Sequence, residues 1–263
     1  TLVESMEQIL PSVTVLLLII ARVSAFFVIL PLFSHRTIPA SHRIAFAVML
    51  SWMMYYTMDV EPFEFNGDYL FLVAKEVIVG LFIGLLAYII LTAVQIAGSF
   101  VDFQMGFAIA NIIDPQTGAQ SPLLGQFFNT LALLLMLALN AHHLLLDGIF
   151  YSYQFVPMEF VWPPFGEPGF AEFIMRTFTA VFAIAFQMSI PIVATLFLVD
   201  IALGITARTV PQLNIFVVGF PIKIGVSFLV LIVMMGVMMN VIKNLFEIMI
   251  LSMRDLMIIL GGG

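Results

Sequence analysis

Residues 69–97 read YLFLVAKEVIVGLFIGLLAYIILTAVQIA, and the only charged side chains in this run are Lys75 and Glu76. A helix that spans a bilayer needs about 20 mostly apolar residues. The stretch therefore predicts a transmembrane helix. Strands are not expected, because the run does not alternate and an open sheet edge leaves backbone groups unsatisfied in hydrocarbon.

Similar apolar segments recur along the whole chain. The last of them is too long for a single span, and we expect it to divide near Asn240–Asn244. The predicted fold is an all-α, polytopic helical membrane protein of six to seven apolar segments. The further segments are Val13–Leu30, Ile44–Met58, Leu123–Ile149, Phe173–Leu203 and Asn214–Leu260.

The composition supports this class. Hydrophobic residues make up 62% of the chain, charged residues only 10%, and the mean hydropathy is +1.15, whereas soluble domains carry about 25% charged residues. Without cysteine there is no disulfide framework or thiolate metal site, and there is no basic footprint for nucleic acid. We expect one helical domain over residues 1–260, with Gly261–Gly263 an added tail outside the fold. Glu4 and Glu7 at the start indicate that the first apolar segment is retained and is not a cleaved signal.

Loop charges predict an orientation. Arg36 and Arg43 lie in the first loop and Arg208 lies in the fifth. The charged residues of the second loop are all acidic. Because Lys and Arg favour the cytoplasmic side, we expect the first and fifth loops inside and the N-terminus outside.

Several ionisable residues interrupt the apolar segments. Such groups are costly in a membrane, so they either pair with one another or mark a functional site. We expect the adjacent Lys75 and Glu76 to point in different directions and to find partners on other helices, not each other. The predicted buried charges are Arg22, Lys75, Glu76, Asp200 and Lys223.

Small residues at helical spacing predict close helix packing. Gly80 and Gly84 form a GxxxG pair, and Gly98, Asp102 and Gly106 recur every fourth residue. Together they form a predicted helix-packing or pore-lining face. We favour packing for the glycines and leave the role of Asp102 open.

One segment between apolar stretches has the chemistry of a turn. It is either an exposed connection or a loop that enters the membrane and lines a lumen, since irregular backbone at membrane depth needs cover from protein or water. Its residues are Asp114, Pro115, Gln116, Thr117, Gly118, Ala119, Gln120, Ser121 and Pro122.

No set of residues predicts catalysis. His142, His143 and Asp147 are too sparse for a metal site, and no catalytic or nucleotide-binding motif occurs, so we expect neither an enzyme nor a cofactor. The charges at Glu76, Asp102 and Asp200 leave open a proton-coupled secondary transporter for a small solute, although the chain lacks an internal repeat. An intramembrane enzyme and a passive assembly scaffold are the other readings.

Three stretches carry a resemblance to a known family. They are RVSAFFVILPLFSHRTIPASHR (Arg22–Arg43), GSFVDFQMGFAIANIIDPQTGAQSP (Gly98–Pro122) and GITARTVPQLNIFVVGFPIKIG (Gly204–Gly225). In order and spacing they resemble the FliR family of flagellar type III export-gate proteins and its virulence-secretion counterparts.

The resemblance implies a spiral export gate of kinked helical hairpins in the bacterial inner membrane, at the flagellar basal body. Its implied partners are FliP-like, FliQ-like and FlhB-like subunits, membrane lipid and the unfolded flagellar subunits that pass through, but no nucleic acid. Residues 1–172 would form a FliP-like part and residues 173–260 a FliQ-like hairpin, and Asp114–Pro122 would plug the channel. The cytoplasmic turn of the hairpin would contain Arg208, Pro211, Gln212 and Asn214.

Overall fold

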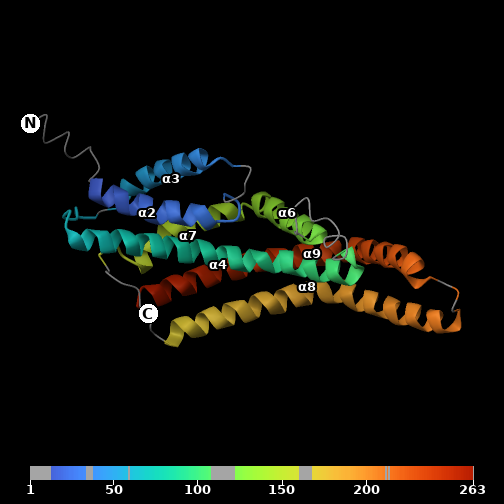
Figure 1. Ribbon diagram of the computed structural model, residues 1–263. Helices are drawn as coiled ribbons and strands as arrows, with labels where there is room; N and C mark the ends of the chain where they lie inside the picture. Colours follow the sequence, from blue (N-terminus) through green and yellow to red (C-terminus); the bar gives the residue numbers. More distant parts are fainter. Residues whose placement is uncertain are drawn as a thin grey trace, which may run out of the picture. The chain divides into compact units, whose positions relative to one another are not determined.

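The computed structural model describes residues 13–33, 38–58, 60–107, 122–159, 168–210, 212 and 214–262. Within these ranges the chain forms α-helices and no strand (Figure 1), which confirms the predicted all-α membrane class. The helices are α2 (Val13–Ile29), α3 (Ala40–Tyr55), α4 (Gly67–Met105), α6 (Leu123–Ala138), α7 (Ala141–Phe155), α8 (Pro168–Thr209) and α9 (Ile215–Leu260).

Two helix boundaries differ from the prediction. The segment Leu123–Ile149 is broken between α6 and α7, where Asn140 adopts a left-handed conformation with φ 56°. Asn tolerates this conformation better than most residues. The predicted division of the last segment near Asn240–Asn244 is wrong, because α9 runs unbroken for 46 residues. Lys243 and Asn244 stand exposed on its surface, so these polar side chains do not interrupt the backbone hydrogen bonds.

Prolines lie inside the long helices without ending them. Pro191 lies within α8 and Pro221 within α9. Membrane helices tolerate proline when neighbouring groups form hydrogen bonds with the backbone carbonyl that proline leaves without a donor. Gly261, predicted to lie outside the fold, continues the hydrogen bonding of α9 by donating its N–H to the carbonyl of Met257 at 3.0 Å.

The chain forms two compact units, each made of separate stretches of sequence. Unit 1 contains the chain up to Ile89, Asn140–Arg176 and Ile248–Gly263, and unit 2 contains Ile90–Leu139 and Thr177–Glu247. The predicted boundary near residue 172 stays a prediction.

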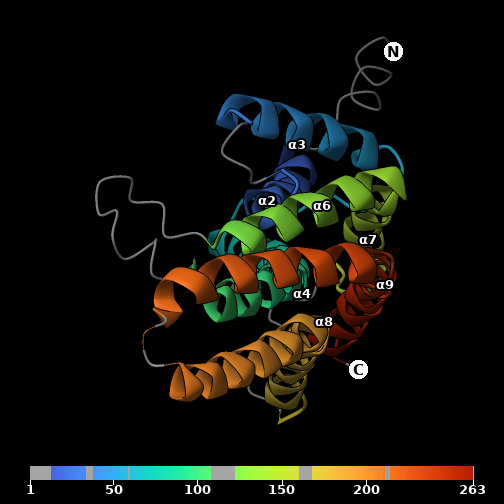
Figure 2. The same ribbon diagram turned by 90° about the vertical axis from the view of Figure 1, so that its right-hand side faces the viewer.

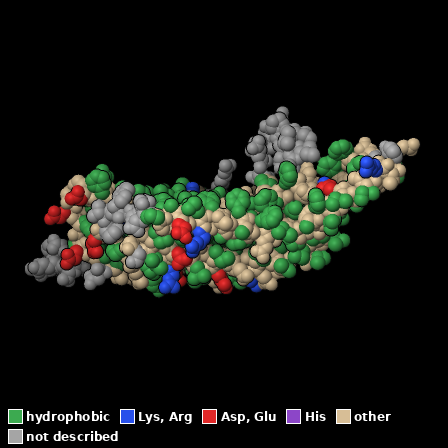
Figure 3. Space-filling view, turned by 90° about the horizontal axis from the view of Figure 1, so that it is seen from below, with side chains coloured by type: hydrophobic (Ala, Val, Ile, Leu, Met, Phe, Trp, Pro, Cys, Tyr) green, Lys and Arg blue, Asp and Glu red, His purple; other side chains and the backbone are tan. Residues whose placement is uncertain are grey.

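Among the residues that the structure describes, the helices α4, α8 and α9 are long and apolar enough to cross a membrane, and α6 with α7 would qualify together as one broken span. The three long helices differ in how much of their apolar 18-residue stretch is buried inside the protein. The buried share is 56% in α4, but only 22% in α8 and 17% in α9. Hydrophobic side chains form large areas of the face shown in Figure 3, with few charged side chains among them. α4 is therefore a core helix, whereas α8 and α9 need cover from outside the chain.

In unit 1, α4 lies directly against the backbone of α2. A Cβ added to Gly80 would be 2.2 Å from the carbonyl oxygen of Arg22, and one added to Gly84 would be 2.9 Å from that of Phe26. Only glycine allows this approach, so the two glycines set the distance between the helices.

We expect Gly80→Ala to destabilise the protein by about 1–3 kcal/mol, because the new methyl group must push α2 away. Thermal unfolding of the detergent-purified protein measures the loss. Gly225→Ala is the matched control, since a Cβ at Gly225 meets nothing within 4 Å. Equal loss of stability in both variants would contradict the close packing of α2 on α4.

Candidate functional site

Arg22 and Glu76 form a buried ion pair between α2 and α4. The guanidinium donates from Nε to Oε2 of Glu76 at 2.5 Å and from Nη2 to Oε1 at 2.8 Å, and both side chains are 0% exposed. Two parallel bonds between a guanidinium and a carboxylate fix orientation as well as distance. This pair therefore sets the rotation of α2 against α4.

The end of α7 supplies the remaining partners of Arg22. Nη1 donates to Oγ of Ser152 at 3.0 Å and Nη2 donates to the carbonyl of Val156 at 2.8 Å. The guanidinium also lies 3.9 Å above the ring of Tyr153, a cation–π geometry. The sequence does not predict these partners, because a serine, a tyrosine and a backbone carbonyl carry no charge that would mark them as partners of Arg22.

Lys75 completes the cluster and corrects an expectation. Its Nζ lies 2.6 Å from Oε1 of Glu76, so these neighbours do pair with each other. Nζ also donates to the carbonyls of Pro157 at 2.9 Å and Met158 at 3.0 Å. The reason is the long, flexible lysine stem, which lets Nζ turn back toward Glu76 while it reaches the carbonyls beyond α7.

The cluster holds two cations and one carboxylate, so Glu76 alone does not balance it. The difference is offset by the nearby carboxylate of Glu159 and by carbonyl oxygens of residues 156–158, just after the C-terminal end of α7, where a helix carries partial negative charge. Because Arg22, Lys75 and Glu76 are fully buried, the cluster joins three helices and offers no surface to a substrate.

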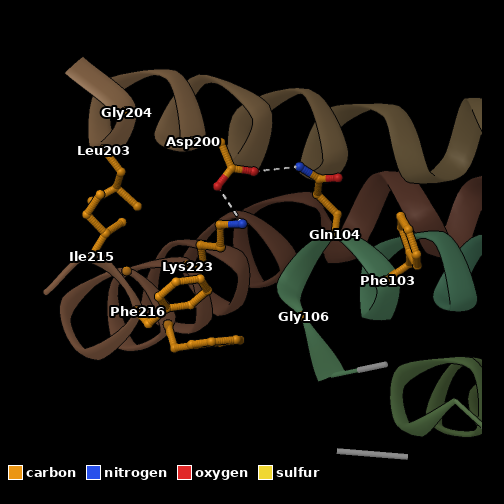
Figure 4. A pocket seen from close by; sticks show the side chains of 11 residues that line it. Phe103, Gln104, Gly106, Asp200, Leu203, Gly204, Ile215, Phe216 and Lys223 are labelled. Atoms are coloured by element: carbon orange, nitrogen blue, oxygen red, sulfur yellow. Dashed lines mark hydrogen bonds and ion pairs between the residues drawn. The ribbon is translucent and has the colours of Figure 1, made fainter. Parts of the chain in front are cut away.

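A second polar cluster lies in unit 2, where α8 and α9 run side by side from their connecting turn (Figure 2). Nζ of Lys223 is 2.5 Å from Oδ1 of Asp200, and Nε2 of Gln104 donates to Oδ2 of Asp200 at 3.0 Å (Figure 4). The side chains of Asp200 and Lys223 are 36% and 21% exposed, so they are only half-buried. Asp200 thus links α4, α8 and α9.

A cavity of about 380 Å³ opens beside this cluster. Its walls are mainly apolar, with Leu203, Ile215 and Phe216 opposite the polar side chains (Figure 4). Gly106, at the end of α4, also lines it with φ 88°, a conformation that favours glycine. The cavity thus combines apolar walls with the polar side chains of Gln104, Asp200 and Lys223.

The other predicted residues are placed as follows. A Cβ on Gly98 would lie 2.5 Å from Cα of Gly125 in α6, and the carboxylate of Asp102 accepts hydrogen bonds from the backbone at the start of that helix. Arg208 is in the last turn of α8, and Gln212 and Asn214 are exposed in the turn that follows. Pro211 and Asp114–Ser121 lie outside the described residues, whereas Pro122 precedes α6.

In the described part of the chain, no group of three or more His, Asp or Glu side chains could hold a metal ion. The two polar clusters pair charged side chains from different helices with each other and, in unit 1, with backbone carbonyls. They bind helices to one another.

The sequence of the chain matches a protein family and several named proteins. The family described as bacterial export proteins, family 1, matches residues 13–249. The chain is 57% identical over 257 residues to flagellar biosynthetic protein FliR of Bacillus subtilis, covering 97% of this chain and 99% of the relative. It is 27% identical over 232 residues to FliR of Escherichia coli, covering 86% of each chain. It is 29% identical over 226 residues to Yop proteins translocation protein T of Yersinia pestis, covering 85% of this chain and 86% of the relative.

We expect Glu76→Gln to destabilise the protein by about 3–5 kcal/mol, because it leaves two buried cations without their carboxylate. Unfolding of the purified protein in detergent checks this. Glu172→Gln is the control: it breaks the exposed pair between Glu172 and Arg176 at 3.0 Å and should cost less than about 1 kcal/mol. A Glu76→Gln protein as stable as this control would show that the cluster does not hold unit 1 together.

Proposed function

This chain belongs to family 1 of the bacterial export proteins, and we propose that it is a subunit of the flagellar type III export gate that forms and gates the channel for unfolded flagellar subunits. The observation that carries the proposal is the match to the family over residues 13–249, together with near-complete coverage of a relative named for flagellar biosynthesis.

The high identity to one flagellar relative supports a flagellar role. The chain shares 57% of aligned residues with FliR of Bacillus subtilis over 97% of its length, whereas FliR of Escherichia coli and the Yop translocation protein of Yersinia pestis are about equally distant, at 27% and 29%. No relative described above is named as a solute transporter, and no observation favours the proton-coupled transporter. The proposal assigns the chain no enzymatic activity and no cofactor.

The exposed faces of α8 and α9 support a multi-subunit assembly. These helices have 42 and 46 residues, about twice what a bilayer span needs. They expose large apolar side chains such as Phe178, Phe182, Ile232 and Val233. We therefore place the chain in the bacterial inner membrane, at the flagellar basal body, where FliP-like, FliQ-like and FlhB-like subunits cover most of these faces and lipid covers the rest.

In this proposal, the segment Asp114–Pro122 closes the channel. The segment contains no Lys or Arg, so it would not hold cationic stretches of an exported chain away by repulsion. It blocks ions at rest, and an arriving subunit displaces it. The turn between α8 and α9 faces the cytoplasm, in keeping with Arg208 and Lys223 beside it.

Deleting Asp114–Ser121 tests the proposal. The deletion keeps Pro122, which precedes α6, and should raise ion conductance of the assembled gate in proteoliposomes while the partner subunits still co-purify. A Gly/Ser stretch of equal length in place of the segment separates the loss of its side chains from the loss of length. Unchanged conductance in an assembled deletion variant would contradict the plug assignment.

A further inference from the structure

The helix α6 begins without a cap of its own. Its N-cap residue is Pro122, which makes no side-chain capping bond. The first backbone N–H groups of a helix have no partner within the helix and need an acceptor when they are buried. A side-chain oxygen at the N-cap position normally accepts from the second or third helical residue, and proline has none to offer.

Asp102 provides this cap from a different helix. Its Oδ2 accepts from the N–H of Leu124 at 2.9 Å and from the N–H of Gly125 at 3.3 Å, the second and third residues of α6. The side chain is only 2% exposed. A carboxylate at a helix N-terminus is also stabilised by the partial positive charge there, so α4 and α6 are joined by both hydrogen bonds and charge.

A glycine crossing one turn earlier makes this contact possible. Gly98 lies on the same face of α4 as Asp102, and a Cβ on it would approach Cα and N of Gly125 to 2.5 Å. A Cβ on Gly125 would in turn lie 2.9 Å from the carbonyl oxygen of Gln95. The two backbones therefore touch, and this closeness brings the carboxylate within reach of the start of α6.

The carboxylate has no alternative partner among the described residues. Its second oxygen, Oδ1, is buried and accepts no hydrogen bond there. If the start of α6 moved away, Oδ2 would lose both of its hydrogen bonds, and the carboxylate would have no hydrogen-bond partner among the described residues. The joint between α4 and α6 therefore favours one closed arrangement over intermediate ones.

We propose that Asp102 is a positioning residue of the gate: by capping α6 from α4, it holds this joint closed and keeps ion leak low between export events. This inference rests on the proposed function. Gln104, two residues along α4, is tied to Asp200 at 3.0 Å, so the last turns of α4 are held on one side by α6 and on the other by α8.

The test is the ion conductance of the assembled gate in proteoliposomes, measured without export substrate. Asp102→Ala removes the cap and should raise the leak roughly fivefold, the factor by which loss of an N-cap shifts a two-state equilibrium. Asp102→Asn keeps a carbonyl acceptor for Leu124 and Gly125 and should leak less than Asp102→Ala. Asp68→Ala, which removes an exposed carboxylate from the same helix, is the matched control and should leave the leak unchanged.

A rescue variant separates capping from general damage. Asp102→Ala combined with Pro122→Asp gives α6 a cap at its own N-cap position, where Asp is among the best residues, and should return the leak toward the wild-type value. The inference is overturned if Asp102→Ala assembles and does not leak, or if the combined variant assembles and leaks as much as Asp102→Ala. If Asp102→Ala alone does not assemble, the combined variant provides the test. A combined variant that assembles but leaks more ions than the wild type would also overturn the inference.

Deletion of Asp114–Ser121 distinguishes the two proposals. If the deletion leaks and Asp102→Ala does not, only the role of Asp102 is wrong. If neither leaks, the plug assignment is wrong as well.

Discussion

Glu76 forms ion pairs with two buried cations, Arg22 and Lys75. The arrangement of unit 1 depends on these contacts. Arg22 comes from α2 and Lys75 from α4, and both also donate to backbone carbonyls that follow α7. In an interior without water, a charge that loses its partner is costly. The three helices therefore have one well-paired arrangement. The glycines Gly80 and Gly84 bring the backbones close enough for it to form.

Helix ends act as charge partners in both units. In unit 1 the two cations reach carbonyls just beyond the C-terminus of α7, and in unit 2 the carboxylate of Asp102 reaches the N-terminus of α6. Each sign is matched to the end of the helix dipole that stabilises it. A chain with 10% charged residues thus neutralises buried charges with backbone groups as well as with other side chains. This explains how it carries ionisable residues in apolar helices without a matching set of counter-ions.

Much of the fold could be predicted from apolar runs, because a helix of about 20 such residues has few alternatives in a membrane. The positions of Arg22 and Glu76 could be found too, since a charge in an apolar run stands out. Their partners could not: Ser152 and the carbonyl of Val156 are unremarkable in sequence, and any residue carries a carbonyl. Residue spacing does not predict the pairing of Lys75 with Glu76, because spacing ignores the reach of a lysine stem. The unbroken α9 could not be predicted from the thickness of a bilayer, because its 46 residues exceed what one span needs.

If the chain is a subunit of an export gate, other subunits cover the exposed apolar faces of α8 and α9. Native mass spectrometry of the detergent-purified protein, isolated from cells that express the complete export system, tests this most directly. It should show the 29.3 kDa chain bound to several other helical membrane subunits, in a complex that survives removal of detergent in the gas phase. A chain that appears alone, or only with lipid, would contradict the account.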